Sequence, residues 1–279
     1  MKRNIRLFAI VIGIITIVSG CKKSSTDPNS NGGNGGTSYI DGVFSASATF
    51  KVRFAPGNLQ YNMHTDTWKF ADNQWDVLGD SFNPFSYSFD GWMDLFGRGT
   101  GNNPTNFSTD YHDYMSFSDW GRNTISNSNY NNWRTLTYEQ WRHIFFDRAT
   151  RSGTRFAKAI VNSHRGVILL PDEWENEIYS LNRINDYNGA HWGDNNISKS
   201  DWENILEPNG AVFLPCGGRR EEMEVSGVNN SGFYWSKSLY NSIENGVCVE
   251  ISFRSLVVHY TNIKTYCGCS VRLVRPSTD

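Results

Sequence analysis

Residues 247–260 read VCVEISFRSLVVHY, and this stretch carries the clearest fold signal of the chain. From Val247 to Phe253 apolar residues alternate with polar or small ones, which is the period of a half-buried strand. The segment 256–260 is rich in β-branched residues and predicts the returning partner of an antiparallel hairpin. The same alternation predicts that Cys248 points outward from the first strand.

The remaining signals predict a mixed fold. Four more segments have strand patterns: 50–54, 68–70, 211–214 and 266–275. Thr137 and Gln140 form a capping-box pattern ahead of the apolar residues in QWRHIFF, and Ser200 and Glu203 repeat it ahead of WENIL. Two short helices, several strands and long Asn/Ser/Gly-rich connections such as 81–132 predict an α+β domain with irregular loops.

The first residues carry export signals. Basic residues precede an apolar stretch at 7–18 that is too short to span a membrane. It ends in VSGC, which resembles the lipobox of bacterial lipoproteins, so we expect residues 1–20 to be removed and Cys21 to be lipidated. Residues 21–38 are rich in Ser, Asn and Gly and predict a flexible linker. Residues 39–279 then form a single predicted domain.

Composition narrows the classes of partner. The formal net charge is −2, from 26 basic and 28 acidic residues, which does not favour nucleic acid or an anionic lipid surface. We therefore expect membrane attachment through the lipid anchor only. Aromatic residues make up 14% of the chain and charged residues only 19%. Aromatic rings in such numbers can fill a core or stack on sugars.

The tripeptide Glu207-Pro208-Asn209 is the one with which C-type lectins hold calcium and mannose-like sugars. Here Pro208 lacks the N–H that a helix interior needs, and Asn209-Gly210 is a turn pair typical of helix ends. A calcium site needs six to eight oxygens, and the Trp-Asn-Asp sequence of calcium lectins does not occur. We therefore interpret the tripeptide as a helix stop, and expect no metal and no cofactor.

Catalytic motifs are missing from the sequence. It contains no His-Glu-x-x-His, Gly-x-Ser-x-Gly or Walker A motif, and no two histidines stand at metal-ligand spacing. Carboxylates cluster at 172–177 and at 221–224, where we expect surface charge. Arg219 and Arg220 can pair there with Glu221 and Glu222 in solvent. We expect no catalytic residue, and hence no enzyme.

Four cysteines follow Cys21, at 216, 248, 267 and 269. An even number in an exported protein permits disulfides. Cys267 and Cys269 share one face of their expected strand and are poorly placed to bond each other. A disulfide from Cys216 to Cys267 or Cys269 is therefore preferred, unless a bulge at Gly268 turns one of these two side chains to the other face of the strand.

Several segments together resemble one bacterial family. In order they are FKVRFAPGNLQY (50–61), TWKFADNQWDVLG (67–79), FDGWMDLFGRGTG (89–101), WRTLTYEQWRHIF (133–145), GAVFLPCGG (210–218), GFYWSKS (232–238) and GCSVRLVRP (268–276). This set resembles the Fibrobacter succinogenes major paralogous domain family, found in secreted or lipid-anchored proteins of gut Bacteroidetes. The resemblance implies a C-type lectin-like fold, which formylglycine-generating enzymes and bacterial adhesins share. It implies no particular activity, because one fold hosts many functions.

These observations lead to three hypotheses. The first is a non-enzymatic recognition or adhesion module for glycan or protein that needs no calcium. Its ligand-binding candidates are Trp192, Asp194, Arg219, Tyr234 and Trp235. The second is a structural subunit of a surface assembly. The third is a copper or thiol oxidase related to formylglycine-generating enzymes, with metal held by the paired thiols of Cys267 and Cys269.

The expected location is the outer membrane. The face stays open, because export of such lipoproteins to the surface typically needs acidic residues just after the lipidated cysteine. Residues 22–25 read KKSS, and the first acidic residue is Asp27. The linker favours surface display, and the missing acidic residues favour the periplasmic face.

Overall fold

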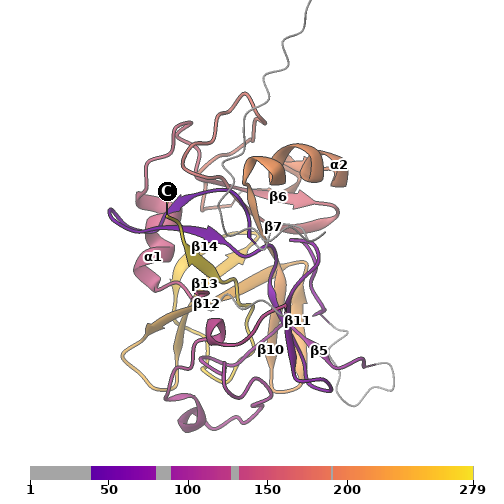
Figure 1. The fold of residues 1–279 in the computed structure, drawn as a ribbon, viewed down its shortest axis with the longest axis vertical. Coiled ribbons are helices and arrows are strands. Elements are labelled where there is room, and N and C mark those ends of the chain that lie inside the picture. The colour runs from indigo at the N-terminus through magenta and orange to yellow at the C-terminus, as the bar shows by residue number, and fades with distance from the viewer. Residues whose placement is uncertain (1–38, 80–88, 127–131, 190, 279) are drawn as a thin grey trace, which may run out of the picture. The chain divides into compact units, whose positions relative to one another are not determined.

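The computed structural model describes residues 39–79, 89–126, 132–189 and 191–278 (Figure 1). The predicted signal peptide, Cys21 and the linker lie outside these residues. The fold is mixed α+β, with two short helices and mostly antiparallel sheets, as the sequence predicts. None of the helices within the described ranges has the length and apolar character needed to cross a membrane.

The strands of the described residues are β1 (Phe44–Ser45), β2 (Lys51–Phe54), β3 (Leu59–Asn62), β4 (Thr67–Phe70), β5 (Trp92–Met93), β6 (Phe156–Val161), β7 (His164–Leu169), β8 (Asn196–Ile197), β9 (Val212–Pro215), β10 (Gly217–Glu221), β11 (Glu224–Val228), β12 (Ser231–Leu239), β13 (Gly246–Ser252), β14 (Leu256–Tyr260) and β15 (Val274–Pro276). They form sheets with the orders β1-β2-β15, β4-β3-β5, β8-β6-β7-β9 and β11-β10-β12-β13-β14. The helices and helical turns are η2 (Tyr111–Tyr114), η3 (Trp120–Arg122), α1 (Tyr138–Arg142), η4 (His143–Asp147), η5 (Trp192–Asp194), α2 (Lys199–Asp201), η6 (Trp202–Leu206) and η7 (Glu207–Asn209).

The hairpin predicted at 247–260 is confirmed as β13 and β14. β13 lies between β12 and β14, so it is an interior strand of the five-stranded sheet. Both of its faces are covered, and Cys248 is buried. The prediction that Cys248 points outward is therefore wrong, because interior strands bury residues on both faces.

The C-terminal segment differs from its prediction. Residues 266–275 were expected to form one strand, but only β15 is regular. The chain before it makes single bridges to three different partners, from Gly268 to Arg220, from Cys269 to Phe96 and from Ser270 to Tyr234. β15 pairs with β2, so strands from the two ends of the domain lie side by side.

Helix α1 begins as the sequence predicts. Thr137 accepts from the N–H of Gln140, and the Gln140 side chain accepts from the N–H of Thr137, which completes the capping box. The helix continues as the π-helical turn η4 and ends at Arg148. It lies beside β14 in Figure 1.

The second helix begins two residues earlier than predicted. Ser198, not Ser200, is its N-cap and accepts from the N–H of Asp201. The helix ends in η7, the Glu-Pro-Asn turn, followed by Gly210 with a φ of 86°. A side chain at Gly210 would bring Cβ within 2.5 Å of the Cα of Gly42. The tripeptide thus ends a helix, as predicted.

Side chains pack into three apolar clusters. The first lies between α1, η4 and the strands around β13, the second contains Cys248, Cys267 and Cys269, and the third lies between the β6–β9 sheet and the second helix. Aromatic rings occupy all three, since Trp141, Trp235 and Trp202 are each almost fully buried. Most of the aromatic content therefore stabilises the core.

Candidate functional site

The aromatic residues predicted to bind ligand are buried. Trp192 is only 4% exposed, and Tyr234 and Trp235 are 0% and 1% exposed. The Tyr234 hydroxyl donates to the carbonyl of Pro215 at 2.7 Å, and the Trp235 indole N–H donates to the carbonyl of Phe96 at 2.6 Å. Burial raises the pKa of Tyr234 far above its usual value. The prediction that these three rings stack on a ligand is wrong, because a second layer covers each strand or turn that carries them.

The two charged candidates, Asp194 and Arg219, are partly exposed, but they bind different partners. Asp194 pairs with Arg183. Arg219 lies over the ring of Phe233, 5.6 Å from its centroid, and its guanidinium is 3.4 Å from Glu221. The structure does not bring the five candidates together into one site.

Arg220 also departs from its prediction of a solvent-exposed pair. It is 1% exposed, donates to the carbonyl of Glu222, and lies 4.8 Å from the centroid of Phe107. Burial lowers the pKa of its guanidinium. Only Arg219 pairs with a neighbouring carboxylate as expected.

The four cysteines within the described residues are free thiols, and all of them are buried. Cys216 packs in the first cluster, while Cys267 and Cys269 pack in the second beside Cys248. The predicted bridge from Cys216 is thus absent from the structure, because its expected partners face another core. Burial raises the pKa of Cys267 to about 12 and that of Cys269 well above its usual value, with the Cys248 thiol beside it as a further cause. Within the described part of the chain no three His, Cys, Asp or Glu side chains are arranged to hold a metal ion.

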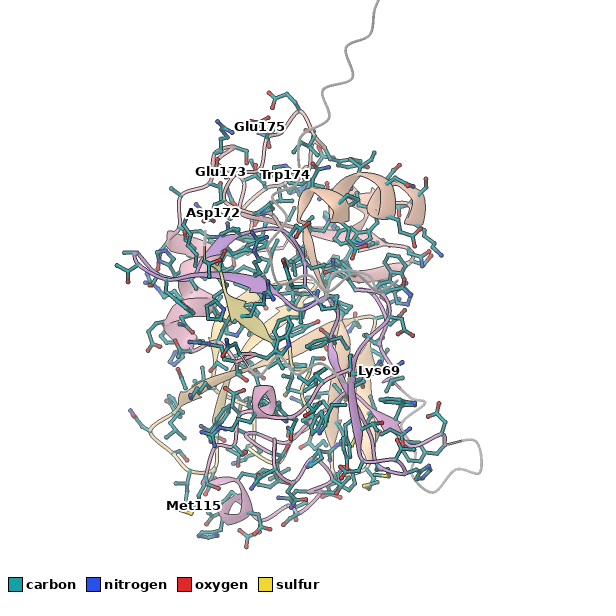
Figure 2. The ribbon with its side chains drawn as sticks, in the orientation of Figure 1. Lys69, Met115, Asp172, Glu173, Trp174 and Glu175 are labelled. Carbon is teal, nitrogen blue, oxygen red and sulfur yellow. The ribbon has the colours of Figure 1, made fainter. Side chains whose placement is uncertain are left out.

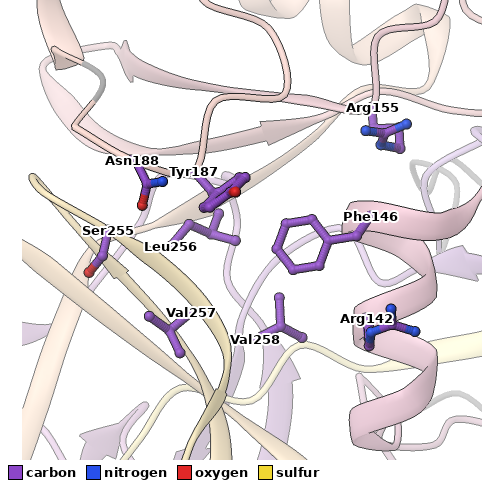
Figure 3. Close-up of a pocket in the computed structure, with 9 residues that line it drawn as sticks. All are labelled: Arg142, Phe146, Arg155, Tyr187, Asn188, Ser255, Leu256, Val257 and Val258. Carbon is purple, nitrogen blue, oxygen red and sulfur yellow. The ribbon is translucent and has the colours of Figure 1, made fainter.

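A candidate site lies at a different place on the described domain. A pocket of about 630 Å³ opens between the helix formed by α1 and η4, the edge strand β14 and the loop that carries Tyr187 and Asn188 (Figure 3). Its lining residues are Arg142, Phe146, Arg155, Tyr187, Asn188, Ser255, Leu256, Val257 and Val258. Its volume is in the range of small-molecule sites.

Two aromatic rings form one wall of the pocket. Phe146 lies on η4, and its ring meets that of Tyr187 edge to face, with centroids 5.8 Å apart and planes at 73°. The neighbouring Phe145 is buried in the first cluster, while Phe146 is only partly buried. Tyr187 is 50% exposed, so one face of its ring is open to a ligand. Figure 3 shows both rings beside Leu256 and Val258.

The polar groups of the pocket are mainly cationic. Arg155 donates through Nε to the carbonyl of Phe145 at 2.9 Å, which orients its guanidinium. Its two terminal nitrogens make no hydrogen bond to the described residues. Arg142 is paired with Asp147 at 2.8 Å. No carboxylate is among the side chains that line the pocket, although Asp147 and Asp186 lie next to it. Arg155 is therefore the cation that remains available to a ligand.

A buried ion pair fixes the helix behind the pocket. Arg148 follows η4, and its Nη1 lies 2.7 Å from the Oδ1 of Asp172. The same guanidinium donates to the carbonyls of Ile144 and Leu170, both at 2.7 Å. Burial lowers the pKa of Arg148 to about 10, although the carboxylate of Asp172 opposes the shift. These bonds hold the turn that carries Phe146 against β7.

The lining residues suit recognition of a ring that bears polar or anionic groups. Aromatic faces and aliphatic side chains can cover the apolar face of a sugar or a flat ring, and guanidinium N–H groups can donate to its oxygens. Asn188 is exposed at the rim and adds an amide. This is the composition expected of a binding pocket: a mostly apolar wall with a few placed polar groups.

Sequence reasoning missed this site because its residues come from four separate segments. Phe146 and Arg155 are within ten residues, but Tyr187 and Leu256 are far along the chain. One usable signal was present: FFDR at 145–148 places two aromatic residues in succession near a helix end, and one helix face cannot bury both. No family model, no curated protein and no solved structure matches this chain.

Proposed function

We propose that this chain is a lipid-anchored protein of the outer membrane whose domain recognises glycan or protein without calcium and without catalysis. The pocket between α1, β14 and the loop at Tyr187 is its binding site. The observation that carries the proposal is the arrangement of Tyr187 and Arg155. A half-exposed ring and a guanidinium with free terminal nitrogens lie on the same pocket.

A C-type lectin-like fold is part of the proposal. Support comes from two short helices, from β2 and β15 pairing near the two ends of the domain, and from long irregular connections such as the one between β5 and η2. The ordered resemblance to the Fibrobacter succinogenes major paralogous domain family supports the same fold. The Glu-Pro-Asn turn takes no part in the proposed site, since Asn209 donates its side-chain amide to the carbonyl of Ile205.

The test is a glycan array probed with the full-length protein in detergent, with calcium and again with chelator. We expect binding that resists the chelator and is reduced about fivefold by Tyr187→Ala, since stacking on one ring contributes about 1 kcal/mol. Tyr111→Ala is the matched control, because Tyr111 also carries a surface ring, stacked on His112, on a turn outside the pocket. Binding that vanishes in chelator would overturn the calcium-free site.

Absence of glycan binding would favour the structural-subunit hypothesis instead. Co-purification of envelope proteins with the wild type, lost on Tyr187→Ala, would then place a protein partner in the same pocket. Copper retained by the purified protein and lost on Cys269→Ser would favour the oxidase hypothesis.

A further inference from the structure

Beyond the residues that line the pocket, further aromatic side chains, which we call the row, lie along the same helix and along β14. Tyr138, Arg142 and Phe146 are spaced by four residues, so they share one side of the helix that begins at α1. Tyr138 stacks on His259 with centroids 4.4 Å apart, and Tyr240 meets the other side of this pair, 6.1 Å from His259 at 63°. The row therefore leads from the pocket to Tyr240, which is 39% exposed.

β14 is irregular in the segment that carries His259. β14 pairs with β13 at Val257–Glu250 and at Tyr260–Cys248, so it holds one residue more than its partner between these two pairs. Such a bulge re-aims side chains and often lies beside a functional site. Here Val258 is buried while His259 is exposed, and the imidazole reaches Tyr138 across the edge of the sheet.

The charges along the row are unequal. Arg155 offers free terminal nitrogens at the pocket end, whereas the Tyr240 end is aromatic. Two carboxylates lie next to the pocket: Asp147 is paired with Arg142, and Asp186 accepts from the backbone N–H of Asn188. We call the pocket together with this row the groove. Its pocket end thus favours an anion, and its Tyr240 end favours an uncharged ring face.

We propose that this groove binds an extended acidic saccharide of at least two sugar units. This inference rests on the proposed function, glycan recognition at the pocket. A carboxylate-bearing unit lies against Tyr187 with its carboxylate at the Nη1 and Nη2 of Arg155. A following unit stacks on Tyr240 beside His259. A guanidinium with two free nitrogens matches a carboxylate in a bidentate bond, and stacking on the second ring makes affinity rise with chain length.

The test compares galacturonic acid, its α-1,4-linked trimer and the same trimer with its carboxyls reduced to alcohols. Titration calorimetry with the full-length protein in detergent gives each affinity. We expect the acidic trimer to bind at least tenfold more tightly than the acidic monomer and than the reduced trimer. Arg155→Gln should weaken the acidic trimer about 10-fold to 100-fold and leave the reduced trimer nearly unchanged. Tyr240→Ala should weaken the trimer about fivefold to tenfold and leave the monomer unchanged.

Control variants separate these effects from misfolding. Arg151→Gln removes a surface guanidinium that pairs with Glu175 away from the groove, and Tyr111→Ala removes a ring outside it; both should bind as the wild type does. Equal affinity for monomer and trimer would overturn the second subsite. Equal affinity for acidic and reduced trimers would overturn the carboxylate site, yet a loss on Tyr187→Ala would still support the proposed function. No binding of any array glycan would overturn the saccharide proposal, and the proposed function would fall as well if no envelope protein then co-purified through Tyr187.

Discussion

The ion pair between Arg148 and Asp172 makes the sharpest prediction about stability. Asp172, labelled in Figure 2, follows β7. Arg148 follows η4, so their bond ties the helix to the sheet behind the pocket. Their side chains are 0% and 12% exposed, with the arginine the more buried. Asp172 also accepts from the N–H and hydroxyl of Ser45, at 2.9 and 2.6 Å. Removing the carboxylate therefore leaves a buried cation without its counterion.

We expect Asp172→Ala to lower the free energy of unfolding by about 3–5 kcal/mol, the cost of breaking a buried pair from one side. The adjacent Glu173→Ala is the matched control. Glu173 lies 3.7 Å from Arg151, with side chains 81% and 61% exposed, and such surface pairs contribute about 1 kcal/mol or less. Urea unfolding followed by tryptophan fluorescence measures both.

A double-mutant cycle tests the cause. Arg148→Met together with Asp172→Ala should cost less than the sum of the single variants by about 1–3 kcal/mol, because the double variant leaves no unpaired charge. An Asp172→Ala cost equal to that of Glu173→Ala would refute the reasoning, since it would mean that water or another group compensates Arg148. Additive costs in the cycle would refute it as well.

Three further predictions concern other buried groups. Burial raises the pKa of Asp94 from 3.8 to about 6, so the folded state binds the extra proton in this window and stability should fall as the pH rises from about 4 to about 6. The loss in the free energy of unfolding is about 3 kcal/mol. Urea unfolding across this pH range should show it. Asp94→Asn, which stays neutral, should abolish this part of the pH dependence. Ellman's reagent should leave the four buried thiols unlabelled in the native protein and label all four after unfolding without reductant; a lower count would reveal a disulfide. Gly210→Ala should cost more than about 2 kcal/mol in thermal or urea unfolding, because it combines a positive φ with contact at Gly42, and an unchanged midpoint would contradict this account of the turn.

Local signals in the sequence predicted the secondary structure where they were strong. The capping box at Thr137, the helix end at Gly210 and the β13–β14 hairpin depend on neighbouring residues and on a regular period. The second helix start was misplaced, because Ser198 and Ser200 both precede suitable residues and only the backbone geometry selects Ser198. The hairpin of β6 and β7 was not singled out at all, since SHRGVILL breaks the alternation where the strand becomes buried on both faces.

The candidate site shows where sequence reasoning stops. Trp192, Tyr234 and Trp235 looked suitable for ligand stacking because of their chemistry, yet chemistry does not say which of several rings remain on the surface. That depends on which segment covers each face. Tyr187 and Tyr240 are among the rings that remain exposed, and neither lies in a motif that the sequence offered.

The sequence by itself determined the α+β class, the start of the first helix at Thr137, the end of the second at Gly210, and the β13–β14 hairpin, because periodicity and capping act over a few residues. Only the tertiary structure decided the burial of Cys248, the separation of Cys216 from the other thiols, and the pocket between Phe146, Arg155 and Tyr187. These features depend on contacts between residues far apart in the chain, whose formation is set by the packing of whole sheets and helices.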